Sequence, residues 1–325
     1  MRQALLEWHG ALWHSLVTTL QARRMPHGLL FHGPAGVGKH LLAQQLVEAA
    51  LCSQPGSDGC ACGQCRDCRL LAAGNHPDLR LVAPPEGKAQ ITIDQIREIG
   101  DFFNLKAQYG LHQCVIIRPA DQMNENAANS LLKTLEEPPE GALLILVTDR
   151  QASISATVRS RCQKILFRLP DSRLTRAWLG KQLPEASDID ALLAQSGGAP
   201  LKAAAMGRGN LHRERLAAWD ELEAIITGQA DPLAVASRWL KLAEKESLYW
   251  IYGWTVDMIR IKMLKNPPRL SNPDLQPRLK AVSEKIEINI IYKQLDKISE
   301  VIRRGNGPLN QQLLLEDLLI GWRPD

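Results

Sequence analysis

Hydrophobic and polar positions follow two patterns in the first half of the chain. Short apolar runs predict buried strands at 29–32, 79–83, 114–117, 143–148 and 164–169. Apolar residues at helical spacing predict helices at 4–22, 41–49, 92–103 and 124–137, and the last two begin with the capping residues Thr92 and Asn124. Alternation of this kind is typical of an α/β domain, so we expect a doubly wound parallel sheet over 29–169.

From residue 170 the spacing of apolar residues is helical throughout. Residues 171–206 read as short helices around a Gly-Gly-Ala-Pro turn. Beyond residue 209 the same spacing predicts helices at 216–226, 235–242, 251–263, 286–302 and 313–320. We therefore expect three domains: an α/β domain at 1–168, a small helical domain at 169–208 and an all-helical domain at 209–325.

A glycine-rich loop follows the first predicted strand. Its sequence, Gly-Pro-Ala-Gly-Val-Gly-Lys at 33–39, lies between that strand and a helix, as in a P-loop. The glycines let backbone N–H groups face phosphate oxygens, the helix N-terminus favours negative charge, and the lysine would reach the outer phosphates. The alternative is a glycine-rich turn without a ligand. The candidate nucleotide-binding residues are Gly33, Gly36, Gly38 and Lys39.

Two parts that ATP hydrolysis needs are missing around this loop. A P-loop enzyme has Ser or Thr after the lysine, because a hydroxyl there ligates Mg²⁺, whereas this chain has His40, whose imidazole prefers softer metals. In such an enzyme, the strand that corresponds to 114–117 ends in acidic residues. Here the run at 114–117 continues into Arg118 and Pro119, and Asp121 comes too late to point the same way. We expect ATP binding to be weak or absent, and hydrolysis to be absent.

Five of the seven cysteines lie within the segment 52–68. Three of them are spaced so that successive thiolates can face one metal ion, and Cys52 can supply a fourth ligand. Four thiolates suit a tetrahedral, structural Zn²⁺, while the same ligands could hold an iron–sulfur cluster or stay reduced. The predicted zinc ligands are Cys52, Cys62, Cys65 and Cys68. Cys60 is surplus and could compete with Cys52 or Cys62.

Composition, charge and cysteine count indicate an ordinary globular protein of a reducing compartment. The 325-residue chain is 45% hydrophobic and 23% charged, as ordinary globular proteins are, and its net charge of +4 does not by itself indicate a nucleic-acid-binding protein. Glu7, His9 and His14 argue against an N-terminal signal peptide, and no run of eighteen apolar residues occurs. An odd number of cysteines without an export signal favours a reducing compartment, so we expect a cytoplasmic protein without a membrane span.

Several motifs together resemble the bacterial clamp-loader branch of the AAA+ ATPases. They are the P-loop with its cysteine cluster, the segment Asn-Ser-Leu-Leu-Lys-Thr-Leu-Glu-Glu-Pro-Pro at 129–139, and Ser-Arg-Cys at 160–162. The similarity is strong over 26–170 and weaker beyond. His40 and Pro119 make the chain similar to a subunit that does not hydrolyse ATP rather than to the motor subunit. Relatives of that kind can lack the P-loop, which is nearly intact here.

The resemblance implies a role in DNA replication. In the family, a ring of subunits of the DNA polymerase III holoenzyme opens a sliding clamp and closes it on primed DNA, using ATP bound between neighbours. Ser160 and Arg161 match the motif whose arginine acts in trans on a neighbour's nucleotide, so the resemblance implies that Arg161 is an arginine finger. An exposed ion pair is the alternative. The sequence places 159–162 on a loop before the last strand.

The same resemblance implies partners and domain roles. The partners would be the motor (tau or gamma) and delta subunits of a hetero-oligomeric ring, and through the ring the clamp and primed DNA. The fold would be an AAA+ P-loop domain, a helical lid domain at 169–208 and an all-α collar domain at 209–325. DNA-directed DNA polymerase (nucleotidyltransferase) activity would belong to the holoenzyme, because no polymerase site is visible. Thr148 matches a polar sensor position or is a plain strand-end threonine.

Two other functions fit parts of the sequence. An active P-loop ATPase subunit of a replication or repair complex would need a hydroxyl at position 40 and an acidic residue after 114–117, and the chain has neither. A zinc-dependent nucleic-acid-binding protein would use the cysteine segment. That segment is nearly neutral and has no aromatic residue on which a base could stack.

Overall fold

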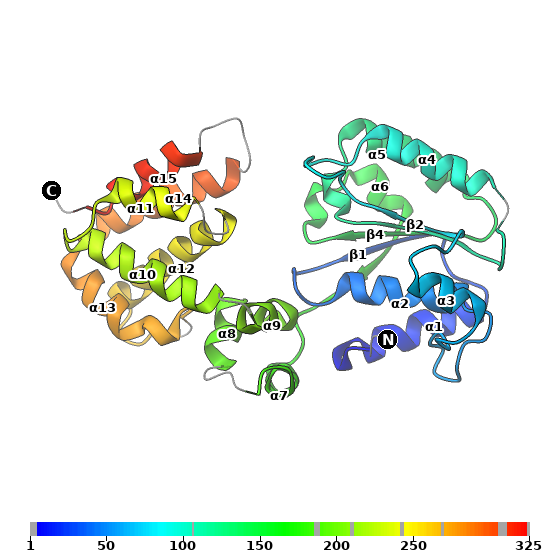
Figure 1. Cartoon of the computed structure of the whole chain (residues 1–325), viewed down its shortest axis with the longest axis horizontal. Coiled ribbons are helices and arrows are strands. Elements are labelled where there is room, and N and C mark those ends of the chain that lie inside the picture. The colour runs from blue at the N-terminus through cyan, green and yellow to red at the C-terminus, as the bar shows by residue number, and fades with distance from the viewer. Residues whose placement is uncertain are drawn as a thin grey trace. The chain divides into compact units, whose positions relative to one another are not determined.

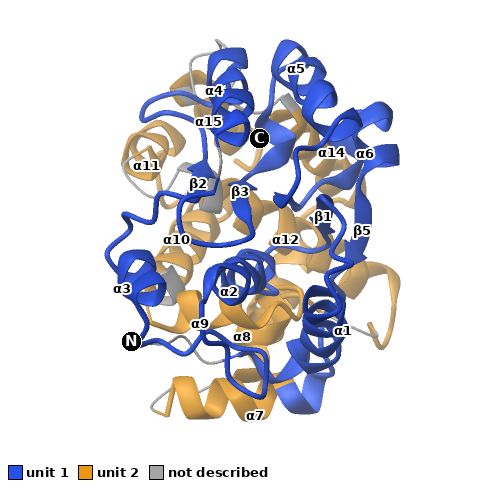
Figure 2. Cartoon of the chain, turned by 90° about the vertical axis from the view of Figure 1, so that its right-hand side faces the viewer, with its two compact units in different colours: residues 1–174 blue, residues 175–325 orange. Residues whose placement is uncertain are grey.

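The computed structural model describes residues 5–105, 107–184, 189–208, 211–240, 244–267, 270–304 and 311–323. The chain divides into two compact units, Met1–Leu174 and Thr175–Asp325 (Figure 2). The first unit combines strands and helices, and the elements of the second are all helical (Figure 1).

A five-stranded parallel sheet forms the centre of the first unit. Its strands lie in the order β2-β3-β4-β1-β5. They are β1 (Gly28–His32), β2 (Leu79–Val82), β3 (Gln113–Ile117), β4 (Ala142–Thr148) and β5 (Gln163–Leu166). The register sets His32 beside Thr148 and Ile117 beside Leu146, so the carboxyl ends of β1, β3 and β4 meet at one edge. This edge is where parallel sheets of this type bind ligands.

Helices cover both faces of the sheet (Figure 1). One face carries α1 (Gly10–Gln21) and α2 (Lys39–Leu51), and the other carries α4 (Ile93–Asn104), α5 (Glu125–Glu136) and α6 (Ala156–Arg161). Leu29 and Phe31 of β1 point into the first core and Leu30 into the second, as alternation along a strand requires. The predicted doubly wound parallel sheet is confirmed. Shorter helices are η1 (Glu7–His9), α3 (Arg66–Ala72), η2 (Ala120–Gln122) and η3 (Gln151–Ser153).

Two predicted helix starts have the expected caps. Thr92 and Gln95 form a capping box at the start of α4, with the Gln95 side chain accepting the Thr92 backbone N–H at 3.1 Å. The side chain of Asn124 accepts the N–H of Ala127 at 2.8 Å at the start of α5. Both caps fix helices whose apolar sides pack on the same face of the sheet.

One local prediction is wrong. The segment before the last strand was expected to be a loop, and it is instead the helix α6. Ser155 caps this helix by accepting the N–H of Val158 at 3.3 Å, and the side chain of Val158 is fully buried. A six-residue helix with one buried position has too few apolar residues for its period to be recognised in the sequence.

The second unit contains two separate hydrophobic cores. A small core includes Leu179, Leu192 and Ala203 and belongs to α7 (Ser172–Gln182), α8 (Ile189–Gln195) and α9 (Pro200–Arg208). A large core contains the fully buried Trp219 and Trp254. Its helices are α10 (Leu211–Ile226), α11 (Pro232–Trp239), α12 (Glu244–Met263), η4 (Pro273–Leu275), α13 (Gln276–Lys285), α14 (Ile288–Arg304) and α15 (Gln311–Ile320). The division into a small and a large helical domain, with boundaries at 168 and 208, stays a prediction.

The large helical part also exposes apolar side chains. More than 40% of the surface of Tyr249, Met263, Tyr292 and Leu313 is accessible. Among the helices that the structure describes, none is both long enough and apolar enough to cross a membrane.

Candidate functional site

The glycine-rich loop begins at the end of β1 and ends at the N-terminus of α2. Gly36 and Gly38 have φ angles of +77° and +94°, in the left-handed region that favours glycine. Gly38 also lies against the N-terminal segment, since a Cβ there would come within 2.6 Å of Leu6 and 2.8 Å of His9. The loop therefore needs glycine for its backbone course and for its packing.

Lys39 is the first residue of α2, and its side chain is buried. Its Nζ donates to the carbonyl oxygens of Gly33 at 2.7 Å and Pro34 at 2.5 Å, and lies 2.6 Å from Oδ1 of Asp149. Burial lowers the pKa of Lys39, and the hydrogen bond and charge of Asp149 offset part of that effect. The ammonium group is thus paired with a carboxylate at the place where a P-loop lysine would bind phosphate oxygens.

The N-terminal segment is bound to this loop. Nε1 of Trp8 donates to the carbonyl oxygen of Val37 at 2.9 Å, and Nε2 of His9 lies 2.9 Å from the same oxygen. Burial lowers the pKa of His9 to about 4, although the hydrogen bond to Val37 opposes that shift. His9 is therefore neutral at pH 7 and carries its proton on Nε2, because a carbonyl oxygen can only accept.

The positions that would hold Mg²⁺ carry a histidine and an arginine. His40 is the second residue of α2, and Arg118 directly follows β3. Burial lowers the pKa of His40, and the positive charges of Arg118 and Lys39 lower it further, so the imidazole is neutral at pH 7. Neither side chain offers the oxygen ligands that Mg²⁺ requires.

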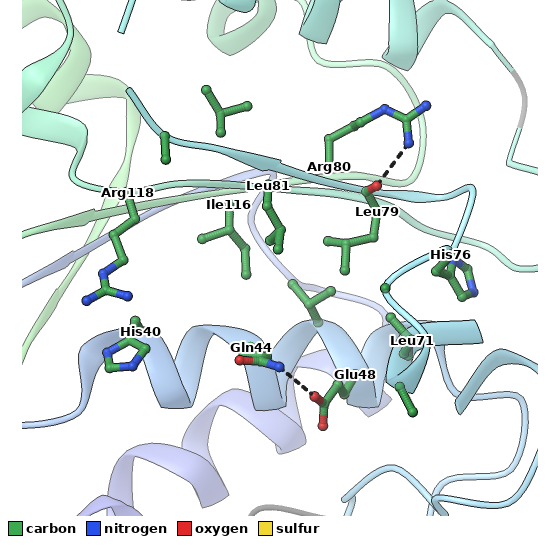
Figure 3. Close-up of a pocket in the computed structure, with 15 residues that line it drawn as sticks. His40, Gln44, Glu48, Leu71, His76, Leu79, Arg80, Leu81, Ile116 and Arg118 are labelled. Carbon is green, nitrogen blue, oxygen red and sulfur yellow. Dashed lines mark hydrogen bonds between the residues drawn. The ribbon is translucent and has the colours of Figure 1, made fainter. Parts of the chain in front are cut away.

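His40 and Arg118 line one end of a pocket of about 630 Å³ between α2 and the strands β2 and β3 (Figure 3). The Arg118 guanidinium extends toward His40, and His76 lies toward the opposite end (Figure 3). The wall between the two ends includes the apolar side chains of Leu79 and Ile116. The space beside the start of α2 is therefore bordered by a cation and an apolar wall, without a carboxylate at the end of β3.

Asp121, the first acidic residue after β3, is engaged elsewhere. Its Oδ1 accepts a hydrogen bond from Thr148 Oγ1 at 2.7 Å, and its Oδ2 accepts one from Arg150 Nε at 3.0 Å. The Thr148 hydroxyl oxygen also accepts the backbone N–H of Arg150 at 2.9 Å. Both carboxylate oxygens of Asp121 are therefore bound within the fold.

Arg161 is the last residue of α6 and is partly exposed. Its Nη2 lies 2.5 Å from Oε1 of Glu136 at the end of α5, and its Nη1 donates to the carbonyl oxygen of Thr157 at 3.0 Å. Ser160 Oγ donates to the same carbonyl oxygen at 2.9 Å. About 35% of the Arg161 side chain and 49% of the Glu136 side chain are accessible, so the ion pair lies at the surface.

Cys52, Cys62, Cys65 and Cys68 converge. Their sulfur atoms all lie within 4.8 Å of one another. Cys68 is 3.6 Å from Cys52 and 3.8 Å from Cys62, and Cys52 is 3.9 Å from Cys65. Sulfurs at the corners of a tetrahedron with metal–sulfur bonds of about 2.3 Å lie roughly 3.8 Å apart. The four side chains therefore have a spacing that could bind one metal ion.

Local backbone geometry holds these four sulfurs in place. Cys52 follows α2 directly, and Cys65 caps α3 by accepting the N–H of Cys68 at 3.4 Å. The backbone N–H groups of Gln64 and Cys65 donate to the sulfur of Cys62 and lower the pKa of that thiol, which favours the thiolate that a metal requires. Cys60 lies outside the group of four and packs against the core beneath α1 and α2.

Close relatives of the chain are known over nearly its whole length. The chain is 33% identical to DNA polymerase III subunit delta' of Pseudomonas aeruginosa over 321 residues, which cover 97% of this chain and 96% of that protein. It is 30% identical to DNA polymerase III subunit delta' of Escherichia coli over 96% of this chain and 93% of that protein. The chain belongs to the DNA polymerase III delta' family.

Two family models match the two parts of the chain, and a solved structure shares its fold. A model described as "DNA polymerase III, delta subunit" matches residues 8–171, and one described as "DNA polymerase III, delta subunit, C terminal" matches residues 210–324. A DNA polymerase III gamma subunit-related protein of Thermotoga maritima aligns with a TM-score of 0.57 and 19% identity over 95% of this chain and 98% of that chain. The expected fold, an α/β AAA+ domain with a helical C-terminal part, is confirmed.

The structure brings some predicted site residues together and adds partners that the sequence did not reveal. The four cysteines meet, and the loop glycines and Lys39 lie at one sheet edge. Asp149 was missed as the partner of Lys39, although it directly follows β4, whose carboxyl end lies beside that of β1. Glu136 was missed as the partner of Arg161, although it belongs to the segment at 129–139.

Proposed function

We propose that this member of the delta' family is a clamp-loader subunit that does not hydrolyse ATP and supplies an arginine to a neighbouring ATPase subunit. One observation supports the first part above all others. The P-loop and Lys39 are present, yet His40 and Arg118 stand where the two Mg²⁺-binding groups would be. Without a metal to polarise the phosphate and orient water, the loop can bind a nucleotide only weakly and cannot hydrolyse it.

The exposure and length of Arg161 support the second part. The guanidinium lies at the surface in an ion pair with Glu136, and an accessible pair of this kind contributes only about 0–1 kcal/mol. The guanidinium of Arg161 therefore loses little free energy when it leaves Glu136 to contact a neighbour's phosphate. A guanidinium donated in trans stabilises the charge of a transferring phosphoryl group, and such arginines raise rates by about 10³- to 10⁵-fold. Ser160 would orient the end of α6 through its bond to Thr157.

Zinc is the metal that we propose for the four cysteines. Four thiolates with sulfur separations of 3.6–3.9 Å suit a closed tetrahedral site, which is structural rather than catalytic. The ion would join the end of α2 to α3 and stabilise the excursion at 52–68. The zinc ion would hold the four sulfurs together, and no step of ATP turnover depends on it.

The proposed partners are the motor (tau or gamma) and delta subunits of the clamp loader, and through them the sliding clamp and primed DNA. The large helical part supports a role in oligomerisation, because apolar side chains such as Tyr249, Met263, Tyr292 and Leu313 are exposed there. We therefore propose 169–208 as the lid and 209–325 as the collar of a hetero-oligomeric ring, working in the cytoplasm.

The test of the proposed function is ATP turnover by the isolated chain in the presence of Mg²⁺. The expected result is no turnover above the background of the Lys39→Ala variant, because the metal-binding groups are missing. A turnover that Lys39→Ala abolishes would show that the chain is an ATPase in its own right and would overturn the proposal.

A further inference from the structure

Arg118 brings a cation to the edge of the sheet beside the P-loop. Its backbone N–H donates to the carbonyl oxygen of Val82 at 2.9 Å, which fixes the residue at the end of β3 next to β2. The side chain is exposed, and its guanidinium makes no hydrogen bond or ion pair with any residue that the structure describes. Other cations of this edge are paired, since Lys39 contacts Asp149 and Arg150 contacts Asp121.

The position of Arg118 is the one from which an acidic side chain would hold Mg²⁺ in a working P-loop enzyme. It is the first residue after β3, and the carboxyl end of β3 lies at the same edge of the sheet as the end of β1, where the loop begins. The guanidinium extends over the start of α2 toward His40 (Figure 3). A positive side chain thus stands at the position of the carboxylate that would hold the metal ion.

The local charges disfavour a divalent cation and favour an anion. Besides burial, the charge of Arg118 lowers the pKa of both Lys39 and His40, so Arg118 and Lys39 bring two positive charges to this part of the loop. His40 is neutral and supplies no oxygen ligand. A phosphate chain, in contrast, would meet the backbone N–H groups of the loop, the ammonium of Lys39 and a free guanidinium.

We propose that Arg118 replaces Mg²⁺, so that the P-loop binds the phosphate chain of a nucleotide without any divalent metal. This role of Arg118 rests on the proposed function in one respect, namely that the loop binds a nucleotide and does not hydrolyse it. Arg118 neutralises part of the phosphate charge that Mg²⁺ neutralises in an active ATPase. Because a guanidinium cannot polarise water as a metal ion does, the bound nucleotide stays intact.

The experiment is a calorimetric titration of the full-length chain with ATP, once with EDTA and once with Mg²⁺. The expected dissociation constants agree within about twofold between the two conditions, and Arg118→Ala raises the constant measured with EDTA by about tenfold. Arg118→Gln, which keeps most of the side-chain volume, gives the same loss. Inorganic tripolyphosphate displaces ATP, because the phosphate chain is the part that Arg118 contacts.

Arg80→Ala is the matched control. Arg80 lines the same pocket, but its guanidinium donates to the carbonyl oxygen of Leu79 and lies over the ring of Phe102, so its loss leaves ATP binding unchanged. An affinity that rises about tenfold or more with Mg²⁺, or an absence of binding in both conditions, overturns the inference and leaves the proposed function standing. Turnover of the bound ATP with Mg²⁺ overturns the proposed function instead.

Discussion

The ammonium of Lys39 lies 2.6 Å from the carboxylate of Asp149, at the edge of the sheet where β1 and β4 end side by side. Lys39 is almost completely buried, whereas about half of the Asp149 side chain is accessible. A phosphate group that binds the loop must therefore compete with a carboxylate of the same chain for the same ammonium.

Replacing Asp149 should strengthen nucleotide binding. In Asp149→Asn the competing negative charge is gone while the side chain keeps its size, so the affinity for ATP should rise by about three- to tenfold, as expected for an interaction of about 1 kcal/mol. The measurement is an ATP titration of the full-length chain. Asp101→Asn, on the exposed side of α4, is the control without effect. A weaker affinity in Asp149→Asn would mean that Asp149 helps to hold the nucleotide.

Removing the charge of Glu136 should release Arg161 without harming the fold. The pair between these residues is accessible and contributes about 0–1 kcal/mol, so Glu136→Gln should raise ATP turnover of a reconstituted clamp loader by no more than about fivefold. Glu137→Gln, an exposed neighbour, should have no effect. If Glu136→Gln instead slows turnover as strongly as loss of the arginine does, Glu136 holds Arg161 in its working position.

Metal analysis should separate the four converging cysteines from Cys60. The purified chain should contain about one zinc ion, because four thiolates make one tetrahedral site. Cys65→Ser should lower the zinc content and the unfolding temperature, and Cys60→Ser should leave the zinc content unchanged. A chain that keeps its full stability after complete removal of metal by a chelator would argue against a structural zinc site.

Acid should destabilise the first unit through His9. Its pKa is lowered to about 4 in the folded protein by burial, while the unfolded chain has the ordinary value of 6.5. Between these values the unfolded state binds more protons, so stability is lost as the pH falls below 6.5, by about 2 kcal/mol at pH 5. Thermal unfolding from pH 7.5 to 5 measures this loss. His9→Gln should show a shallower decline with pH, and an unchanged slope would mean that His9 does not cause the acid sensitivity.

The fold was largely predictable because its strands are buried and its helices amphipathic. Four of the five β4 residues from Leu143 to Val147 are at most 2% exposed, and runs of that kind are visible in any sequence of a parallel sheet. The helices α6 and α13 were missed because they are short, and α13 buries few apolar positions. Their stability comes from packing within each unit, which periodicity does not report.

The candidate site was predictable where its residues are close in the sequence. The loop glycines with Lys39, and the cysteines with their short spacing, are recognisable from sequence separation alone. The pairing of Lys39 with Asp149 depends instead on the strand order, which brings together residues more than a hundred positions apart. Likewise, the lack of a partner for the Arg118 side chain among the described residues depends on which carboxylates the fold brings near it.

The proposed action of Arg161 on a neighbour's ATP is tested most directly by ATP turnover of the reconstituted clamp loader with Arg161→Ala. The predicted result is an intact ring with a turnover that is slower by about 10³-fold or more, as for other arginines donated in trans. Arg159→Ala, two residues earlier on the same short helix, is the control expected to keep normal turnover. An unchanged rate in an intact Arg161→Ala ring would contradict the account.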